Sequence, residues 1–297
     1  MHARTMAFSG MSARRTRLRN ALAGTQCLNC PSVFDPMSAR LAEAAGFGIG
    51  ILGGSAAALT LLGLPDLNLI TLTELSGLTR RITDTSDVAL IVDADGGYGN
   101  ALNVMRTVGE LEAAGAAGLS IEDSWLPQAY GRHTDPLIPI DEAADKLRAA
   151  VSARRDPSFV LFARTSARAC RSDDELIERL TRYADTGVDA LCIVGSDNDE
   201  RLAKISAHIR LPWLLIGYAG SDPARLDTLA SHGARLHLDG HHGMLAALEA
   251  MQTAYRSLPG AAPATPPLST DALVPHLSRV ARYREAERYL KPATASG

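Results

Sequence analysis

Short apolar runs alternate with longer amphipathic stretches over most of the chain. The apolar runs have the length and hydrophobicity of strands that are buried on both faces of a parallel sheet. We expect strands at residues 31–34, 49–53, 88–93, 118–122, 159–163, 190–194, 212–216 and 234–238. The stretches between them predict helices, among others over 37–45, 101–114, 141–153, 173–186, 198–208, 223–231 and 243–256. Eight strands with intervening helices are typical of the α/β class, and the expected fold is a closed (β/α)8 barrel of the TIM type.

The expected barrel spans residues 27–258 and is preceded by an N-terminal extension, residues 1–26. This extension is rich in Arg, and we expect a surface helix over residues 14–23 that packs on the fold. It lacks the continuous apolar segment of a secretory signal. Met11 is an alternative start to Met1.

A Pro-rich linker opens the last segment, residues 259–297, and helical character returns over residues 270–289. Such a linker can carry a helix away from its own domain onto a neighbouring subunit. We therefore expect this C-terminal helical segment to serve oligomerisation.

Composition narrows the class of protein. A chain of 297 residues can bury a large core without disulfides, and a net charge of −3 argues against a nucleic-acid or membrane-surface partner. The sequence contains no apolar run of about 18 residues that would span a bilayer. Four scattered cysteines fit a reducing cytoplasm. Cys27 and Cys30 form an isolated CxxC, so two ordinary small residues are favoured over a zinc or redox site.

Carboxylates gather where two of the predicted strands end. Asp93 and Asp95 follow one apolar run, and Glu122 with Asp123 follows the next. The carboxyl ends of barrel strands meet at one rim, where like charges would repel unless a cation lay between them. Mg²⁺ prefers oxygen ligands, so the sequence predicts a Mg²⁺ site. The less favoured alternative is that these acids cap helix N-termini.

An ordered set of motifs resembles the isocitrate lyase/phosphoenolpyruvate mutase superfamily over roughly residues 15–290. The motifs are Ser32 to Arg40, Gly53-Gly54-Ser55, Pro65-Asp66, Asp93-Ala94-Asp95, Ile121-Glu122-Asp123 and Ala163-Arg164-Thr165. The segment from Glu122 through Arg132, together with Gly240-His241, is most similar to the bacterial oxaloacetate decarboxylase branch. The resemblance implies an α/β barrel, a bound Mg²⁺ and a small α-keto acid substrate. It also implies a homodimer or homotetramer with swapped C-terminal helices.

The resemblance assigns Asp93, Asp95 and Glu122 to the metal-site carboxylates, which would reach Mg²⁺, with Mn²⁺ as a substitute, directly or through bound water. Arg164 falls on a substrate-binding arginine, and its planar fork suits a carboxylate. A salt bridge from Arg164 to a metal-site acid is the alternative, and the two roles are compatible.

The remaining matches lie around the substrate. Gly53, Gly54 and Ser55 fall on a loop that binds the substrate carboxylate, where small residues let backbone N–H groups approach an anion. Asp66 is expected in the same site. His241 is expected to bind the substrate or move a proton, with a purely structural role as the alternative.

Tyr218, after the seventh predicted strand, is a weaker candidate of the same kind as His241. His237 lies within the last predicted strand and is expected to be packed.

The stretch at 128–133 contains no cysteine, whereas the lids of isocitrate and methylisocitrate lyases carry one as an acid/base group. We therefore expect Mg²⁺-dependent decarboxylation of oxaloacetate, or of a related β-keto acid, to pyruvate and CO₂ through a metal-stabilised enolate. One alternative is a C–C lyase or hydrolase, similar to methylisocitrate lyase, that acts on a related 2-keto or 2-hydroxy diacid. The other is a non-catalytic barrel that binds pyruvate-like ligands.

Overall fold

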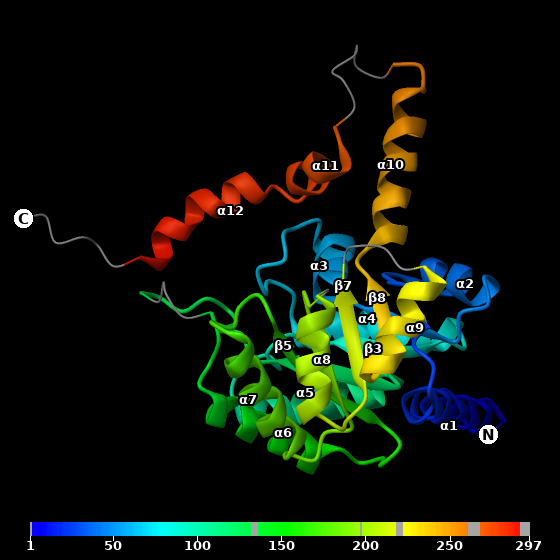
Figure 1. The fold of residues 1–297 in the computed structure, drawn as a ribbon. Helices are drawn as coiled ribbons and strands as arrows, with labels where there is room; N and C mark the ends of the chain where they lie inside the picture. Colours follow the sequence, from blue (N-terminus) through cyan, green and yellow to red (C-terminus); the bar gives the residue numbers. More distant parts are fainter. Residues whose placement is uncertain (1, 132–135, 197, 218–221, 261–267, 292–297) are drawn as a thin grey trace, which may run out of the picture.

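A parallel sheet of eight strands forms the centre of the computed structural model, which describes residues 2–131, 136–196, 198–217, 222–260 and 268–291. The strands are β1 (Leu28–Asn29), β2 (Ile49–Leu52), β3 (Ala89–Asp93), β4 (Gly118–Glu122), β5 (Val160–Ser166), β6 (Ala190–Val194), β7 (Trp213–Gly217) and β8 (Ala234–Asp239). Their order in the sheet is β1-β8-β7-β6-β5-β4-β3-β2. Figure 1 shows most of the helices packed around this sheet.

The segment after β1 closes the sheet into a barrel. The N–H of Cys30 donates to the carbonyl of His237 in β8 at 2.7 Å, and the N–H of Ile51 in β2 donates to the carbonyl of Pro31 at 3.0 Å. The strand expected at 31–34 thus lies at this seam, but its regular part is β1, because Pro31 has no N–H to donate to a ladder. The predicted (β/α)8 barrel is confirmed.

Helices follow the strands along the chain, and their bounds agree with the predicted helices to within two residues where both exist. They are α2 (Pro36–Ala44), α3 (Gly54–Leu62), α4 (Leu72–Thr85), α5 (Ala101–Ala113), α6 (Ile140–Ala153), α7 (Asp173–Ala184), α8 (Asp199–His208), α9 (Pro223–His232) and α10 (His242–Arg256). The sequence pattern did not predict α3 and α4. The side chains of α3 are almost all apolar and show no polar stripe, so helical periodicity is absent there.

Alternate strand residues face two separate cores. Ile91 and Phe162 point to the barrel axis and pack in the inner cluster. Leu90 and Leu161 point outward and pack against the helices in a larger cluster. Because side chains alternate along a strand, these cores determine which residues at the strand ends face the barrel mouth.

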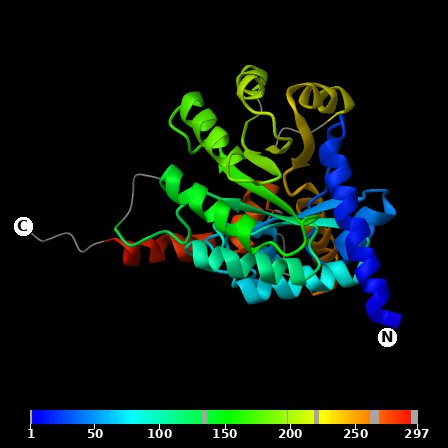
Figure 2. The ribbon, with the colours of Figure 1, turned by 90° about the horizontal axis from the view of Figure 1, so that it is seen from below.

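The Arg-rich N-terminus forms α1 (His2–Ala23), which crosses the underside of the barrel (Figure 2). Four arginines of α1 donate to backbone carbonyl groups there: Arg14, Arg15, Arg17 and Arg19. Leu18 is fully buried in the inner cluster. The expected surface helix is therefore present, longer than predicted, and its arginines attach it to the barrel.

The C-terminal region forms α11 (Thr270–Leu277), α12 (Val280–Ala286) and the 3-10 helix η1 (Glu287–Leu290). The helical stretch expected over 270–289 is interrupted at Arg279, whose φ of 58° is left-handed. Figure 1 shows α10 standing away from the barrel, while α11 and α12 return across its upper side. The division of the chain at residues 26 and 258 stays a prediction. Within the described residues, no helix is both long and apolar enough to cross a membrane.

Candidate active site

Three strand ends bring the predicted acids and Arg164 together at one rim of the barrel. Asp93 is the last residue of β3 and Glu122 the last of β4, and Glu122 is the register partner of Arg164 on β5. All three side chains face the barrel mouth, because each stands two residues beyond a residue on the inner face. The sequence predicted this gathering, and the structure confirms it.

Arg164 lies between the two acids. Its Nη1 donates to Asp93 Oδ2, and its Nη2 lies 3.0 Å from Glu122 Oε2. Burial alone would lower the pKa of Arg164, but the charges of Asp93 and Glu122 outweigh burial and hold that pKa well above its usual value. The salt bridge that the sequence left open as an alternative is thus present.

Asp95 lies beside Asp93, in the loop that follows β3. Its φ of 46° is left-handed, and its side chain is buried and accepts a hydrogen bond from Asn68 Nδ2 at 2.8 Å. A Cβ on Gly54 would lie 2.6 Å from Asp95 Oδ1 and 3.6 Å from Asp93 Oδ2. Gly54 therefore lies directly against both carboxylates, which explains why a residue without a side chain is needed there.

Negative charge exceeds positive charge at this rim, because the four acids Asp66, Asp93, Asp95 and Glu122 lie near two cationic side chains, Arg164 and the buried Lys146. Desolvation, with the charge of Asp93 added, raises the pKa of Asp66 and holds the pKa of Asp95 well above its usual value. Burial also raises the pKa of Glu122, although Arg164 opposes the shift. An additional cation would relieve this repulsion.

The acids are gathered but do not yet converge on one point. Among the residues that the structure describes, no three His, Cys, Asp or Glu side chains are arranged to hold a metal ion. Arg164 accounts for this arrangement, since it draws Asp93 and Glu122 to its own two nitrogen atoms. The assignment of Asp93, Asp95 and Glu122 as metal ligands stays a prediction.

The predicted carboxylate-binding loop forms the N-terminus of α3. The N–H of Gly54 donates to Asp93 Oδ2 at 3.3 Å, so this donor already binds an anionic oxygen. The hydroxyl of Ser55 lies 2.6 Å from His241 Nε2. A Cβ on Gly53 would lie 3.0 Å from His241 Cε1, so the imidazole ring rests closely on this loop.

His241 follows β8 and is held by hydroxyl groups on both ring nitrogens. Ser32 Oγ lies 3.0 Å from Nδ1, opposite the contact of Ser55 with Nε2. Burial lowers the pKa of His241, so the neutral ring is the favoured form near pH 7. A neutral imidazole between two hydroxyl groups can accept a proton at one nitrogen while it donates at the other.

A cavity of about 90 Å³ opens between these groups. Its polar lining includes Ser55, Asp66, Asp93, Arg164 and His241. Polar groups that converge on a small cavity are typical of a site for a small molecule. Tyr218, the weaker candidate, lies outside the described residues.

Sequence reasoning did not assign site roles to three residues that contact the predicted ones. Ser32 contacts His241, Asn68 contacts Asp95, and Ser120 Oγ donates to Asp93 Oδ1 at 3.2 Å. The position of Ser120 carried a usable signal, because it stands two residues before Glu122 in an apolar strand and so faces the same side. Asn68 lies outside every predicted element and carried no comparable signal.

Comparisons with known proteins agree with the geometry. The family model described as phosphoenolpyruvate phosphomutase matches residues 18–258. A protein of Rhodopseudomonas palustris (strain BisB18) named oxaloacetate decarboxylase is 45% identical over 261 residues, which cover 88% of this chain and 89% of that protein.

Two solved structures resemble this one over most of their length. Phosphonopyruvate hydrolase in complex with oxalate and Mg²⁺ has a TM-score of 0.73 and 28% identity, covering 94% of this chain and 99% of that one. Oxaloacetate acetylhydrolase with its product oxalate has a TM-score of 0.73 and 27% identity, covering 95% of this chain and 98% of that one. The chain belongs to the phosphoenolpyruvate phosphomutase family, within the isocitrate lyase/phosphoenolpyruvate mutase superfamily.

Proposed function

We propose that this protein is a divalent-metal-dependent carboxy-lyase that converts oxaloacetate, or a closely related β-keto acid, to pyruvate and CO₂. The observation that carries the proposal is the placement of Arg164 between Asp93 and Glu122, with Asp66 and Asp95 nearby, beside a small polar cavity. The 45% identity to a protein named oxaloacetate decarboxylase supports the choice of substrate.

Asp93, Asp95 and Glu122 would hold the metal ion, Mg²⁺ in first place and Mn²⁺ as a substitute. Their oxygen atoms are the donors that these ions prefer, and the excess negative charge at the rim favours a dication. Asp93 and Glu122 would turn part of the way from Arg164 toward Asp95. When bound, the ion would draw electron density from the keto group of the substrate.

Arg164 would then bind the substrate. If Asp93 and Glu122 held the ion, two N–H groups of the Arg164 guanidinium would be available to the cavity and would match the two oxygens of a carboxylate. The N–H of Gly54, now bonded to Asp93, would be available to the same substrate carboxylate. Arg164 and the Gly53-Gly54-Ser55 loop would thus orient the keto acid end.

The departing carboxylate lies at the other end of the substrate. The C3–C4 bond breaks, its electron pair passes into the enolate of pyruvate, and C4 leaves as CO₂. The enolate then takes a proton at C3. Ser55 and His241 form a hydrogen-bonded pair at the cavity and would relay this proton, with Ser32 holding the far ring nitrogen. Tyr218 remains a weaker candidate for the same task.

Product analysis separates this reaction from the alternatives. A decarboxylase releases one pyruvate for each oxaloacetate, a hydrolase that cuts the C2–C3 bond releases oxalate and acetate, and a non-catalytic barrel releases neither. Each product is measured with Mg²⁺ and with chelator, after subtraction of the spontaneous reaction without protein. Pyruvate that appears only with Mg²⁺ supports the proposal, and oxalate or no product contradicts it.

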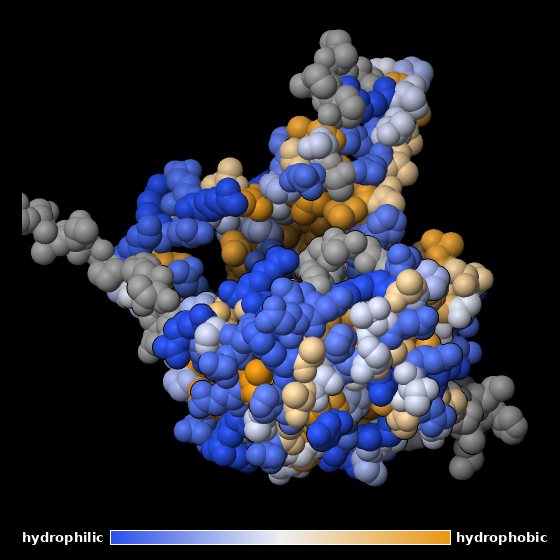
Figure 3. Space-filling model, viewed as in Figure 1, coloured by the Kyte–Doolittle hydropathy of each residue, from blue (hydrophilic) through white to orange (hydrophobic). Residues whose placement is uncertain are grey.

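The proposal includes a homodimer or homotetramer with swapped C-terminal helices, in the cytoplasm. Met251, Tyr255 and Leu258 are exposed on or just after α10. Figure 3 shows apolar side chains between α10, α11 and the top of the barrel, where a helix from a second copy could pack. All four cysteines lie in the described residues and are free thiols, in keeping with a reducing compartment. Light scattering on the purified chain distinguishes a monomer from either oligomer.

A further inference from the structure

The ends of β4 and β5 are joined on both of their faces. Glu122 and Arg164 are register partners and form the ion pair inside the barrel. Asp123 follows Glu122, and Thr165 follows Arg164. Because side chains alternate along a strand, these two point away from the interior of the barrel. There, Thr165 Oγ1 donates to Asp123 Oδ2 at 2.9 Å, so a second link lies behind the first.

Two side chains of α7 complete this outer link. Tyr183 OH donates to Asp123 Oδ2 at 2.7 Å, and Arg179 Nη1 donates to the same oxygen at 3.2 Å. Asp123 is only 2% exposed, so Oδ2 of its carboxylate exchanges water for these three donors. We call Asp123, Thr165, Arg179 and Tyr183 the outer clamp.

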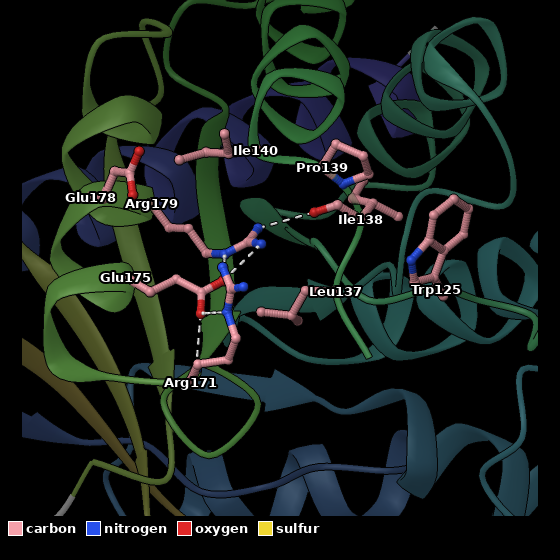
Figure 4. A pocket seen from close by; sticks show the side chains of 9 residues that line it. All are labelled: Trp125, Leu137, Ile138, Pro139, Ile140, Arg171, Glu175, Glu178 and Arg179. Atoms are coloured by element: carbon pink, nitrogen blue, oxygen red, sulfur yellow. Dashed lines mark hydrogen bonds and ion pairs between the residues drawn. The ribbon is translucent and has the colours of Figure 1, made fainter. Parts of the chain in front are cut away.

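The outer clamp is anchored on the side away from the barrel. Arg179 also donates to the carbonyl of Ile138, ahead of α6, and pairs with Glu175 at 3.2 Å (Figure 4). Glu175 in turn accepts from Arg171, as Figure 4 shows. The clamp therefore connects the rim of β4 and β5 to α7 and to the chain that enters α6.

We propose that the outer clamp positions Glu122 and Arg164 for metal and substrate binding, a role that rests on the proposed function. None of its four residues lines the cavity, so they act through their neighbours. A change in the separation of the two strand ends moves both members of the inner pair, and a misplacement of about 1 Å at a reacting centre can cost on the order of 100-fold in rate.

A matched control exists on the underside of the barrel. Glu112 is also a buried acid, 6% exposed, and accepts from the N–H of Asp156 at 2.7 Å and of Arg155 at 3.1 Å. It lies near Arg15 of α1, far from the rim. In a (β/α)8 barrel this face serves stability, so Glu112→Gln tests the loss of a buried charge without an effect on the site.

The test compares Thr165→Val, which removes one hydroxyl at constant shape, with Thr165→Ser, which keeps it. Tyr183→Phe is the second variant, so that the test can still be made if Thr165→Val does not fold. For each protein we would measure KM and kcat for oxaloacetate, the melting temperature, and the dissociation constant of Mn²⁺ by electron paramagnetic resonance of the free ion.

We expect Thr165→Val and Tyr183→Phe to raise both KM and the Mn²⁺ dissociation constant by about ten-fold, with Thr165→Ser within about two-fold of the wild type. Glu112→Gln should lower the melting temperature and leave both constants unchanged. Variants that lower only the melting temperature, as Glu112→Gln does, would overturn the positioning role, and so would a wild type that binds no Mn²⁺. A wild type that binds Mn²⁺ but releases no pyruvate contradicts the proposed function alone, because the Mn²⁺ constants still test the clamp.

Discussion

Arg164 on β5 reaches across the end of β4 to donate a hydrogen bond to Asp93 on β3. The same guanidinium also pairs with Glu122, so one side chain joins three consecutive strand ends. The positive charge of Arg164 thus balances part of the negative charge of the acids at the rim. This arrangement also predicts how the protein responds when either charge is changed.

Replacing Arg164 with Met should destabilise the metal-free protein. Asp93 and Glu122 would lose their counter-charge while they remain mostly buried, and breaking a buried pair in this way costs about 3 kcal/mol in free energy of unfolding. Mg²⁺ should restore part of the loss, because it supplies the missing positive charge. Urea unfolding with chelator and with Mg²⁺ measures both effects.

The matched control for Arg164→Met is Arg182→Met, which removes the exposed ion pair with Asp141. This change should cost less than about 1 kcal/mol, and Mg²⁺ should not alter its effect. Equal losses in the two variants would contradict the account of the rim.

The pH dependence of stability should reveal the acids whose pKa values are raised in the folded protein. The folded pKa values of Asp66, Asp95 and Glu122 lie above their unfolded values of about 4, so at intermediate pH the folded state binds more protons than the unfolded state. These groups therefore contribute stability at low pH that is lost as the pH rises through their folded pKa values. In chelator, Asp95→Asn should remove part of this loss and raise the melting temperature more at about pH 8 than at about pH 4.

Mg²⁺ should act in the opposite direction, since it competes with protons for the same oxygens. The rise in melting temperature that Mg²⁺ produces should be larger at about pH 8 than at about pH 5. A rise that is independent of pH, or larger in acid, would place the ion elsewhere.

His241 should matter for the chemical step more than for binding. His241→Asn is expected to lower kcat by about 100-fold, as for loss of a proton-transfer group, and Ser32→Ala by about ten-fold through loss of ring orientation. KM should change little in either variant. His208→Asn is the control, because His208 is exposed on α8 and bonds only to the carbonyl of Lys204 among the contacts described. A variant of His241 with normal kcat would assign the proton to another group.

Substitution of Arg15 tests whether α1 contributes to the stability of the barrel. Arg15 is buried and donates to the carbonyl of Glu112 and to Asp156, so Arg15→Met should cost about 3 kcal/mol in free energy of unfolding. The values of kcat and KM should stay unchanged in protein that remains folded. Arg106→Met, which removes an exposed pair with Glu110 on α5, should cost less than about 1 kcal/mol.

The strands, and with them the acids at the rim, were predictable because an apolar run that ends in carboxylates marks where a buried strand reaches the surface. The directions of the side chains were not predictable. Asp93 and Arg164 stand 71 residues apart, and local pattern carries no information about which acids a guanidinium pairs with. The structure therefore shows the ion pair of Arg164, while its role in substrate binding stays a prediction.

The sequence also did not predict helices and contacts that depend on tertiary packing. The short apolar helix α3 shows no amphipathic stripe, yet it places Gly54 and Ser55 against Asp93 and His241. Asn68 adopts a left-handed φ of 56° between α3 and α4, and only the folded chain brings it to Asp95. Such contacts arise from the way separate elements pack together, so a single sequence does not reveal them.

The most direct test of the central claim is the release of pyruvate from oxaloacetate by the wild type and by Asp93→Asn, each with Mg²⁺ and with chelator and corrected for the spontaneous reaction. We expect one pyruvate per oxaloacetate for the wild type with Mg²⁺. We expect background rates for the wild type in chelator and for Asp93→Asn in both conditions. Turnover that survives the chelator, or that Asp93→Asn leaves unchanged, would contradict the claim that a dication held by these carboxylates supports cleavage of the C3–C4 bond.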